Sequence, residues 1–348
     1  MEKCIFVPMK KCLIFVLYIM LLSGRAFAQG PDDAAFKFLN LSTSARANAL
    51  GGNNISIVEK DISLIYQNPA LLGPELDKQL NLNFTAYMEG IKLGSVTFGK
   101  AVNNRSAWGI GMHYLDYGTI VETSPDGSIL GDFSVKDLSL SGFYGYDFSE
   151  RLRGGFAIKA IYSSYAEFTS FALGVDLGLN YYNVDKGFSG SLTFKNLGGQ
   201  LVKYDEISEK MPWDIQLGIS QKLEHAPIRF SITAQHLNKW DLTVYPTYET
   251  DANGILVEKK DSFGKTLLKH FIFGVDVLPT QNVWLAVGYN FKRKEDLQLA
   301  EQRGLTGFTA GAGIKVSSFQ AGFSLSQMHV GALSYSFSIS TNLGAFNL

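Results

Sequence analysis

The sequence lacks the features that would place it in several common classes of protein. It has only two cysteines, Cys4 and Cys12, so the chain beyond its N-terminus has no disulfide or thiol chemistry. Its 31 basic and 32 acidic residues nearly balance, which gives no indication of a nucleic-acid partner. After the N-terminus, no apolar run reaches the roughly 18 residues that a membrane-spanning helix needs. A helical membrane bundle is therefore excluded.

Catalytic signatures are also missing. The five histidines are scattered without the spacing of metal ligands. Ser262 and Lys265 match a Ser-x-x-Lys motif whose partner motifs are absent, and Gly264-Lys265-Thr266 lacks the first glycine of a phosphate-binding loop. We expect no enzyme activity, no cofactor and no metal.

The N-terminus predicts export. Lys10 and Lys11 precede a short apolar run over residues 12–22, and Ala26-Phe27-Ala28 follows as a small-x-small cleavage signature. These are the parts of a secretory signal peptide, which we assign to residues 1–28. Both cysteines are removed with it.

The stretch from Phe171 to Tyr181 alternates strictly between large apolar residues and small or polar ones. Because a strand sends successive side chains to opposite faces, this segment has one apolar and one polar face. The polar face carries little bulk, as expected for the wall of a lumen, and the apolar face suits lipid. This pattern indicates a strand of an outer-membrane β-barrel.

The same pattern recurs along residues 79–348 and predicts an all-β, transmembrane antiparallel barrel. The expected strands number about fourteen: 80–88, 92–101, 106–115, 136–147, 152–163, 170–182, 188–196, 213–223, 227–237, 269–279, 282–291, 307–316, 318–326 and 333–343. An even number is usual for bacterial barrels. A soluble sandwich is the alternative interpretation.

The connections support a barrel. Short turns alternate with longer segments, and the longer ones are expected to be outer loops: 116–135, 197–212, 238–268 and 292–306. Four bulky residues break the alternation because they fall on the polar face: Phe143, Ile161, Ile272 and Trp284. Such residues would pack against a segment that plugs the lumen.

Residues 29–78 are not strand-like, and we expect them to form this hatch or plug. They contain, in order, Ser44-Ala45-Arg46-Ala47, Leu50-Gly51-Gly52, Asp61 and Asn68-Pro69-Ala70. This order resembles the N-terminal hatch of FadL-like outer-membrane proteins. The sequence from Phe38 to Gly52 resembles the PorV/PorQ family of type IX secretion system barrels, and within that family it is nearer to the PorQ branch.

Arg46 is the hatch residue of most interest, because a guanidinium inside a barrel needs acceptors. We expect it to pair with Asp61, Asp176 or Asp276; a position at a wet barrel mouth or a role in ligand binding are the alternatives. Gly51 and Gly52 permit a turn with positive φ. The prolyl turn Asn68-Pro69-Ala70 is interpreted as a rigid tether rather than a gate.

The 238–268 loop is the best candidate for binding a partner. Trp240, Tyr245 and Tyr248 are rigid aromatics of the kind that dominate interfaces, although they could instead belong to the interfacial aromatic girdle. The basic run Lys292-Arg293-Lys294 could meet lipopolysaccharide phosphates, but the acidic residues that follow favour a solvated loop.

The PorV/PorQ resemblance implies a non-enzymatic barrel subunit in the outer membrane. It would anchor a PorZ-like surface protein in the attachment complex that processes cargo and links it to lipopolysaccharide, together with a PorU-like sortase and a PorV-like barrel. Two alternatives stay open. One is a FadL-like transporter of hydrophobic small molecules, and the other is a PorV-like barrel that binds the cargo signal.

Overall fold

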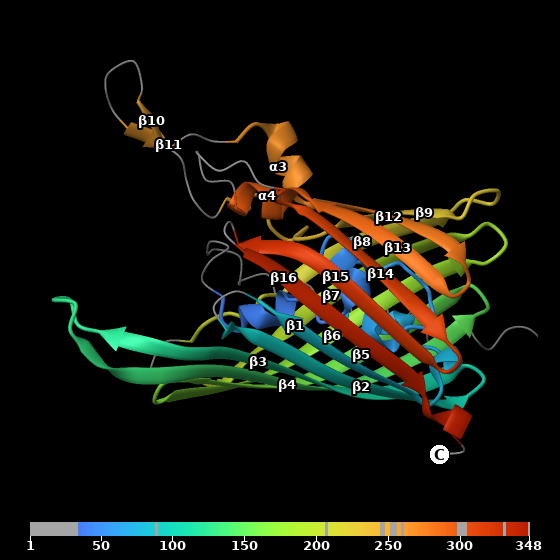
Figure 1. The fold of residues 1–348 in the computed structure, drawn as a ribbon, viewed down its shortest axis with the longest axis horizontal. Coiled ribbons are helices and arrows are strands. Elements are labelled where there is room, and N and C mark those ends of the chain that lie inside the picture. The colour runs from blue at the N-terminus through green and yellow to red at the C-terminus, as the bar shows by residue number, and fades with distance from the viewer. Residues whose placement is uncertain are drawn as a thin grey trace, which may run out of the picture. The chain divides into compact units, whose positions relative to one another are not determined.

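The strands form one closed antiparallel barrel of fourteen strands, drawn in Figure 1. The computed structural model describes residues 34–87, 90–205, 208–243, 248–250, 256–258, 261–297, 305–329 and 332–346, so the expected signal peptide lies outside the described residues. The barrel strands are β1 (Gln79–Ala86), β2 (Lys92–Asn103), β3 (Ser106–Thr123), β4 (Ile129–Ser149), β5 (Leu152–Tyr165), β6 (Phe168–Asn183), β7 (Phe188–Val202), β8 (Asp214–Lys222), β9 (Ile228–Ala234), β12 (Phe271–Thr280), β13 (Val283–Asn290), β14 (Phe308–Val316), β15 (Phe319–His329) and β16 (Ala332–Asn342).

Short helices precede the barrel strands and occupy some of the connections. They are η1 (Lys37–Asn40), α2 (Ala45–Ala49), η2 (Ile62–Tyr66), η3 (Pro69–Leu71), η4 (Pro74–Leu76), α3 (Phe263–Lys269), α4 (Phe291–Leu297) and η6 (Leu343–Phe346). In the part of the chain that the structure describes, none of the helices has the length and apolar character to cross a bilayer. A separate two-stranded sheet consists of β10 (Tyr248–Thr250) and β11 (Leu256–Glu258).

The barrel closes where β1 pairs with β16, with Gln79 opposite Asn342 and Ala86 opposite Tyr335. Inward-facing side chains support this seam: the amide of Asn81 donates to Ser340 Oγ at 2.8 Å. Closure leaves no unpaired strand edge in the wall, which is the condition for a sheet to cross a membrane.

The two faces of the wall follow the alternation in the sequence. In β16, four large residues point outward and are 44–55% exposed, and four serines alternate with them and are buried: Leu333, Tyr335, Phe337 and Ile339 against Ser334, Ser336, Ser338 and Ser340. The barrel therefore turns an apolar surface outward and a polar surface to the lumen, and the soluble-sandwich interpretation is wrong.

Residues 34–78, called the plug below, lie against the inward faces of the strands. Helix α2 contacts β13, β14, β15 and β16, and η3 contacts β4, β5 and β6. The four bulky residues on the polar face meet the plug. Phe143 packs edge-on against Tyr66, Ile161 lies in a cluster with Phe38, Ile272 faces Gly51, and Trp284 lies beneath Arg46.

The long connections differ from expectation. The segment 116–135 is mostly strand: β3 and β4 continue as a paired hairpin, with Thr119 opposite Ser134 and Val121 opposite Asp132. This hairpin projects well beyond the other strands in Figure 1. In this extension the strict alternation of apolar and polar residues is absent, but the backbone ladder does not depend on alternation. We call this end of the barrel the loop end.

The other three expected loops also contain regular structure. Strand β7 continues to Val202 within 197–212, the 238–268 segment holds β10, β11 and most of α3, and α4 occupies the start of 292–306. At the opposite end, which we call the turn end, the connections are brief, as between Asn103 and Ser106 or Val316 and Phe319. The last described helix, η6, also lies at the turn end (Figure 1).

Candidate functional site

Arg46 occupies the centre of an ionic cluster between plug and wall. It lies in α2, whose first turn is capped by Ser44, which accepts a hydrogen bond from Ala47 N. Its side chain is only 1% exposed, with Nη1 2.7 Å from Asp276 Oδ1 and two bonds of 3.1 Å donated to the carboxylate of Glu59. Of the three carboxylates that the sequence offered, Asp276 is the partner.

A second arginine completes the cluster. Arg229, on β9, donates to Asp276 Oδ2 at 2.9 Å and to Glu59 Oε1 at 2.6 Å. Two guanidinium groups thus share two carboxylates, which compensates charges that would be costly to bury alone. The indole of Trp284 covers the guanidinium of Arg46, 4.3 Å from the ring centroid, and adds a cation–π contact.

The cluster holds Glu59 in its ionised form. Burial on its own would raise the pKa of this carboxyl, but the charges of Arg229 and Arg46 outweigh burial and lower the pKa to about 2. Glu59 and Arg46 belong to the plug, and Arg229 and Asp276 to the wall. The cluster therefore ties the plug to β9 and β12.

The Gly51-Gly52 turn follows α2, and both residues have φ of +97°. The wall holds this turn through two side chains: Thr309 Oγ1 accepts from Gly51 N at 2.9 Å, and the amide of Asn290 donates to Gly51 O at 3.1 Å. A side chain at position 51 would meet Ile272 and one at position 52 would meet Arg293. Glycine is needed here for both conformation and space.

The Asn68-Pro69-Ala70 turn lies in a cradle of wall glycines. Asn68 caps it by accepting from Ala70 N at 2.9 Å and donates to Ile55 O at 2.9 Å. A Cβ on Gly155 would lie 2.3 Å from Pro69 O, and one on Gly178 would lie 2.0 Å from Asn68 Oδ1. This close backbone approach fits the expected rigid tether.

Asp61 and Asp176 have other partners. Asp61 caps η2 by accepting from Ser63 N at 3.0 Å. Asp176 forms a second buried ion pair within the wall, with Oδ2 2.6 Å from Lys159 Nζ, and its Oδ1 accepts from Asn196 N at 2.7 Å.

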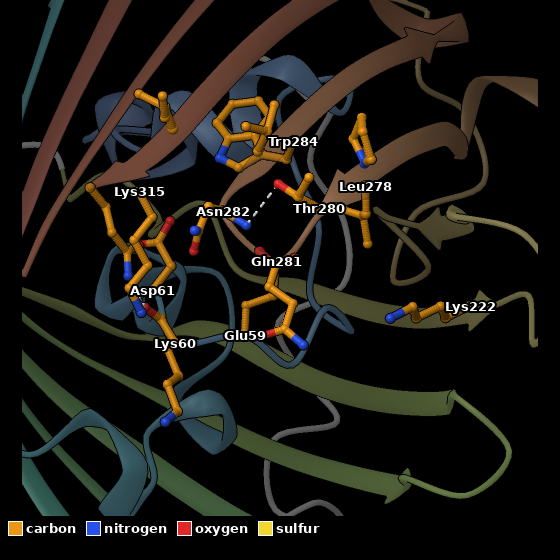
Figure 2. Close-up of a pocket in the computed structure, with 14 residues that line it drawn as sticks. Glu59, Lys60, Asp61, Lys222, Leu278, Thr280, Gln281, Asn282, Trp284 and Lys315 are labelled. Carbon is orange, nitrogen blue, oxygen red and sulfur yellow. Dashed lines mark hydrogen bonds between the residues drawn. The ribbon is translucent and has the colours of Figure 1, made fainter. Parts of the chain in front are cut away.

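An open cavity of about 580 Å³ lies at the turn end, beside the ionic cluster (Figure 2). Glu59 and Trp284 line it together with the β12–β13 connection and Lys60, Lys222 and Lys315. Figure 2 shows these lysines spaced around the cavity rather than gathered at one point. The cavity thus gives access from the turn end to residues that hold the plug.

The outer-loop aromatics are only partly described. Trp240 is 51% exposed and packs against Phe263 and His270, with ring centroids at 5.1 and 5.7 Å. Tyr248 begins β10, and Tyr245 lies outside the described residues. Of these three side chains the structure describes that of Trp240 alone, so a shared binding surface stays a prediction.

Sequence reasoning missed two members of the ionic cluster, Glu59 and Arg229. A usable signal exists for Arg229, because it shares its strand face with Ser231 and Thr233 and so points to the lumen. Glu59 lies in an irregular stretch without periodicity. Within the described ranges, no group of three or more histidine, cysteine, aspartate or glutamate side chains is placed to hold a metal ion.

A closed fourteen-stranded antiparallel wall with an irregular N-terminal segment in its lumen is the FadL-like barrel fold. Among solved structures, the chain is similar to the CymD monoaromatic hydrocarbon channel, with a TM-score of 0.55 and 14% identity over 88% of this chain and 99% of that one. It is equally similar to the toluene transporter TbuX of Ralstonia pickettii, with a TM-score of 0.55 and 11% identity over 88% of this chain and 100% of that one.

A FadL homologue of Pseudomonas aeruginosa matches with a TM-score of 0.50 and 10% identity over 86% of this chain and 98% of that one. At these identities the likeness concerns the fold alone. No family model and no curated protein matches the sequence.

Proposed function

We propose that this protein is a non-enzymatic outer-membrane barrel that holds a partner protein at the cell surface. The observation that carries the proposal is the projecting β3–β4 hairpin. Its tip exposes Val121, Ile129 and Leu130, which are 52%, 72% and 63% exposed. In outer-membrane barrels the longer loops face outward, so this apolar tip would stand in water beyond the membrane. Apolar surface displayed in this way is typical of interaction sites.

The plug supports an anchoring role. Two guanidinium groups and two carboxylates fix it to β9 and β12, and the prolyl turn is seated against Gly155 on β5 and Gly178 on β6. A transport cycle that displaced the plug would have to separate these buried charges, which is costly.

The resemblance of residues 36–72 to the PorV/PorQ family supports a more specific assignment. In this proposal the barrel is a PorQ-like subunit of the type IX attachment complex, the surface partner is PorZ-like, and a PorU-like sortase and a PorV-like barrel complete the complex. Catalysis then belongs to the sortase. A PorV-like role, in which the barrel binds the cargo signal, would place cargo among its partners instead.

A second candidate is a transporter of hydrophobic small molecules. The solved structures that resemble this chain favour it more directly than the secretion role, because two of them are a monoaromatic hydrocarbon channel and a toluene transporter. The cavity at the turn end would then lie on the side where a ligand leaves.

The two functions are separated by purifying a tagged, functional copy from its own cells in mild detergent and identifying what accompanies it. A large surface protein that disappears when residues 238–268 are shortened, or when the hairpin tip is made polar, supports anchoring. Recovery of the barrel alone, with a bound apolar compound identified by mass spectrometry, overturns anchoring and supports transport.

A further inference from the structure

The side chains around the cavity at the turn end carry a net positive charge, which neither proposed function explains. Three lysines line it, and they come from three elements: Lys60 from the plug, Lys222 from the end of β8 and Lys315 from β14. No described carboxylate lies within ion-pair distance of their ammonium groups. These cations are therefore available to a ligand.

The acidic groups of the cavity are already engaged. Glu59 is shared by Arg46 and Arg229, and Asp61 accepts from Ser63 N. The cavity lining and the ionic cluster behind it together contain five cationic and three anionic side chains. The cations are Arg46, Arg229, Lys60, Lys222 and Lys315, and the anions are Glu59, Asp61 and Asp276. An anion entering the cavity would meet a positive potential.

The remaining lining suits a polar, multiply charged group. The β12–β13 connection contributes the amide side chains of Gln281 and Asn282, which can donate hydrogen bonds to an oxyanion. Lysine is a common phosphate binder because its ammonium acts as a point charge, and lysines that are spaced around a cavity suit a ligand with more than one charged group. The volume of about 580 Å³ is that of a small-molecule site.

We propose that this cavity binds a phosphate-bearing ligand at the turn end of the barrel. The phosphate can belong to a soluble compound or to the headgroup of a phospholipid in the adjacent leaflet. A phospholipid headgroup can reach the cavity from the outward face of the wall, because Ile314, which lines the cavity next to Lys315, is 51% exposed on that face. The proposal is independent of whether the barrel anchors a partner or transports a ligand.

The test uses the full barrel purified in a nonionic detergent at about 0.15 M salt, where non-specific attraction between exposed charges is screened. Calorimetric titration with inorganic pyrophosphate is expected to give saturable binding. The double variant K222Q/K315Q should bind about fivefold more weakly, because two ion pairs between lysine and phosphate are lost. The matched control is K186Q, since Lys186 is exposed on the β6–β7 connection at the same end and does not line the cavity.

A second arm examines the lipid source. The barrel is reconstituted in nanodiscs that contain phosphatidylglycerol and phosphatidylcholine, and the lipids that stay bound are identified by native mass spectrometry. Retention of phosphatidylglycerol by the native chain and by K186Q, but not by K222Q/K315Q, identifies a headgroup site. Pyrophosphate binding without such retention identifies a soluble ligand.

Two results overturn the proposal. One is the absence of both pyrophosphate binding and selective lipid retention. The other is an equal loss of binding in K186Q and in K222Q/K315Q, which would mean that the lysines attract anions only through the overall positive charge of the turn end. All variants are first shown to keep the heat-modifiable electrophoretic mobility of a folded barrel.

Discussion

Nη1 of Arg46 in the plug lies 2.7 Å from Oδ1 of Asp276 in the wall, and the two side chains are 1% and 0% exposed. They come from segments more than two hundred residues apart, and both are buried where the plug meets the wall. This contact makes the position of the plug sensitive to a single charge on β12.

Replacing that charge is the most direct test of the ionic cluster. D276N keeps the size of the side chain but leaves Arg46 and Arg229 with Glu59 as their only carboxylate. We expect a loss of about 3 to 5 kcal/mol in the free energy of unfolding, the usual cost of removing one partner from a buried ion pair. Denaturant unfolding in detergent, followed by tryptophan fluorescence, measures it.

The control for D276N is D185N. Asp185 pairs with Arg151 at 3.8 Å, and the two side chains are 85% and 56% exposed. An exposed pair contributes at most about 1 kcal/mol, so D185N should unfold nearly as the native protein does. Equal stability of D276N and the native chain would show that the cluster does not hold the plug.

The glycine cradle predicts a steric effect without any change of charge. G155A places a methyl group 2.3 Å from the backbone oxygen of Pro69, whereas the same change at Gly142 meets nothing within 4 Å. We expect G155A to lose about 1 to 3 kcal/mol, as overpacking does, and to make the plug more accessible to limited proteolysis. G142A, on the neighbouring strand β4, should behave like the native chain, and similar digestion of both variants would argue against the cradle.

The sequence predicted the wall well and the ionic cluster only in part. Each wall strand has an outward face and a face towards the lumen, and successive residues alternate between them. The two faces can therefore be predicted from the alternation of residue types in Phe171 to Tyr181 and in the last strand. The bulky exceptions Phe143 and Trp284 contact Tyr66 and Arg46 of the N-terminal segment.

Two features could not be predicted from the sequence: the full ionic cluster and the extension of β3 and β4. Arg229 and Glu59 are 170 residues apart, and only the closure of the barrel around the plug brings them within 2.6 Å. The extension of β3 and β4 was missed for another reason. Beyond the membrane both faces of a hairpin meet water, and the alternation that identifies a strand is lost.

Glu59 gives the plug a predictable response to acid. Its pKa is lowered to about 2 in the folded barrel, from an ordinary value of 4.5. A carboxyl whose pKa falls on folding stabilises the protein fully above the ordinary value, and this contribution is lost as the pH falls towards the folded value. The native barrel should therefore lose stability between about pH 4.5 and pH 2.

E59Q removes this titration. We expect the variant to be less stable than the native chain at pH 7 and pH 5, with a difference that shrinks as the pH falls from about 4.5 towards 2. Unfolding midpoints at pH 7, 5, 4 and 3 measure the difference, and E122Q on the exposed hairpin serves as the control. A difference that stays constant over this range would contradict the assignment of Glu59 as the titrating group.

The projecting hairpin allows anchoring to be tested without disturbing the lumen. The triple variant V121S/I129S/L130S makes the exposed tip polar, and because these side chains are 52–72% exposed, the barrel should keep its unfolding midpoint. Hydrophobic anchors dominate the affinity of interfaces, so the surface partner should be lost from the pull-down. V184S is the matched control, since Val184 is 70% exposed but lies at the turn end. Undiminished recovery of the partner with the triple variant would exclude the hairpin tip as the docking site and leave the 238–268 segment to be examined next.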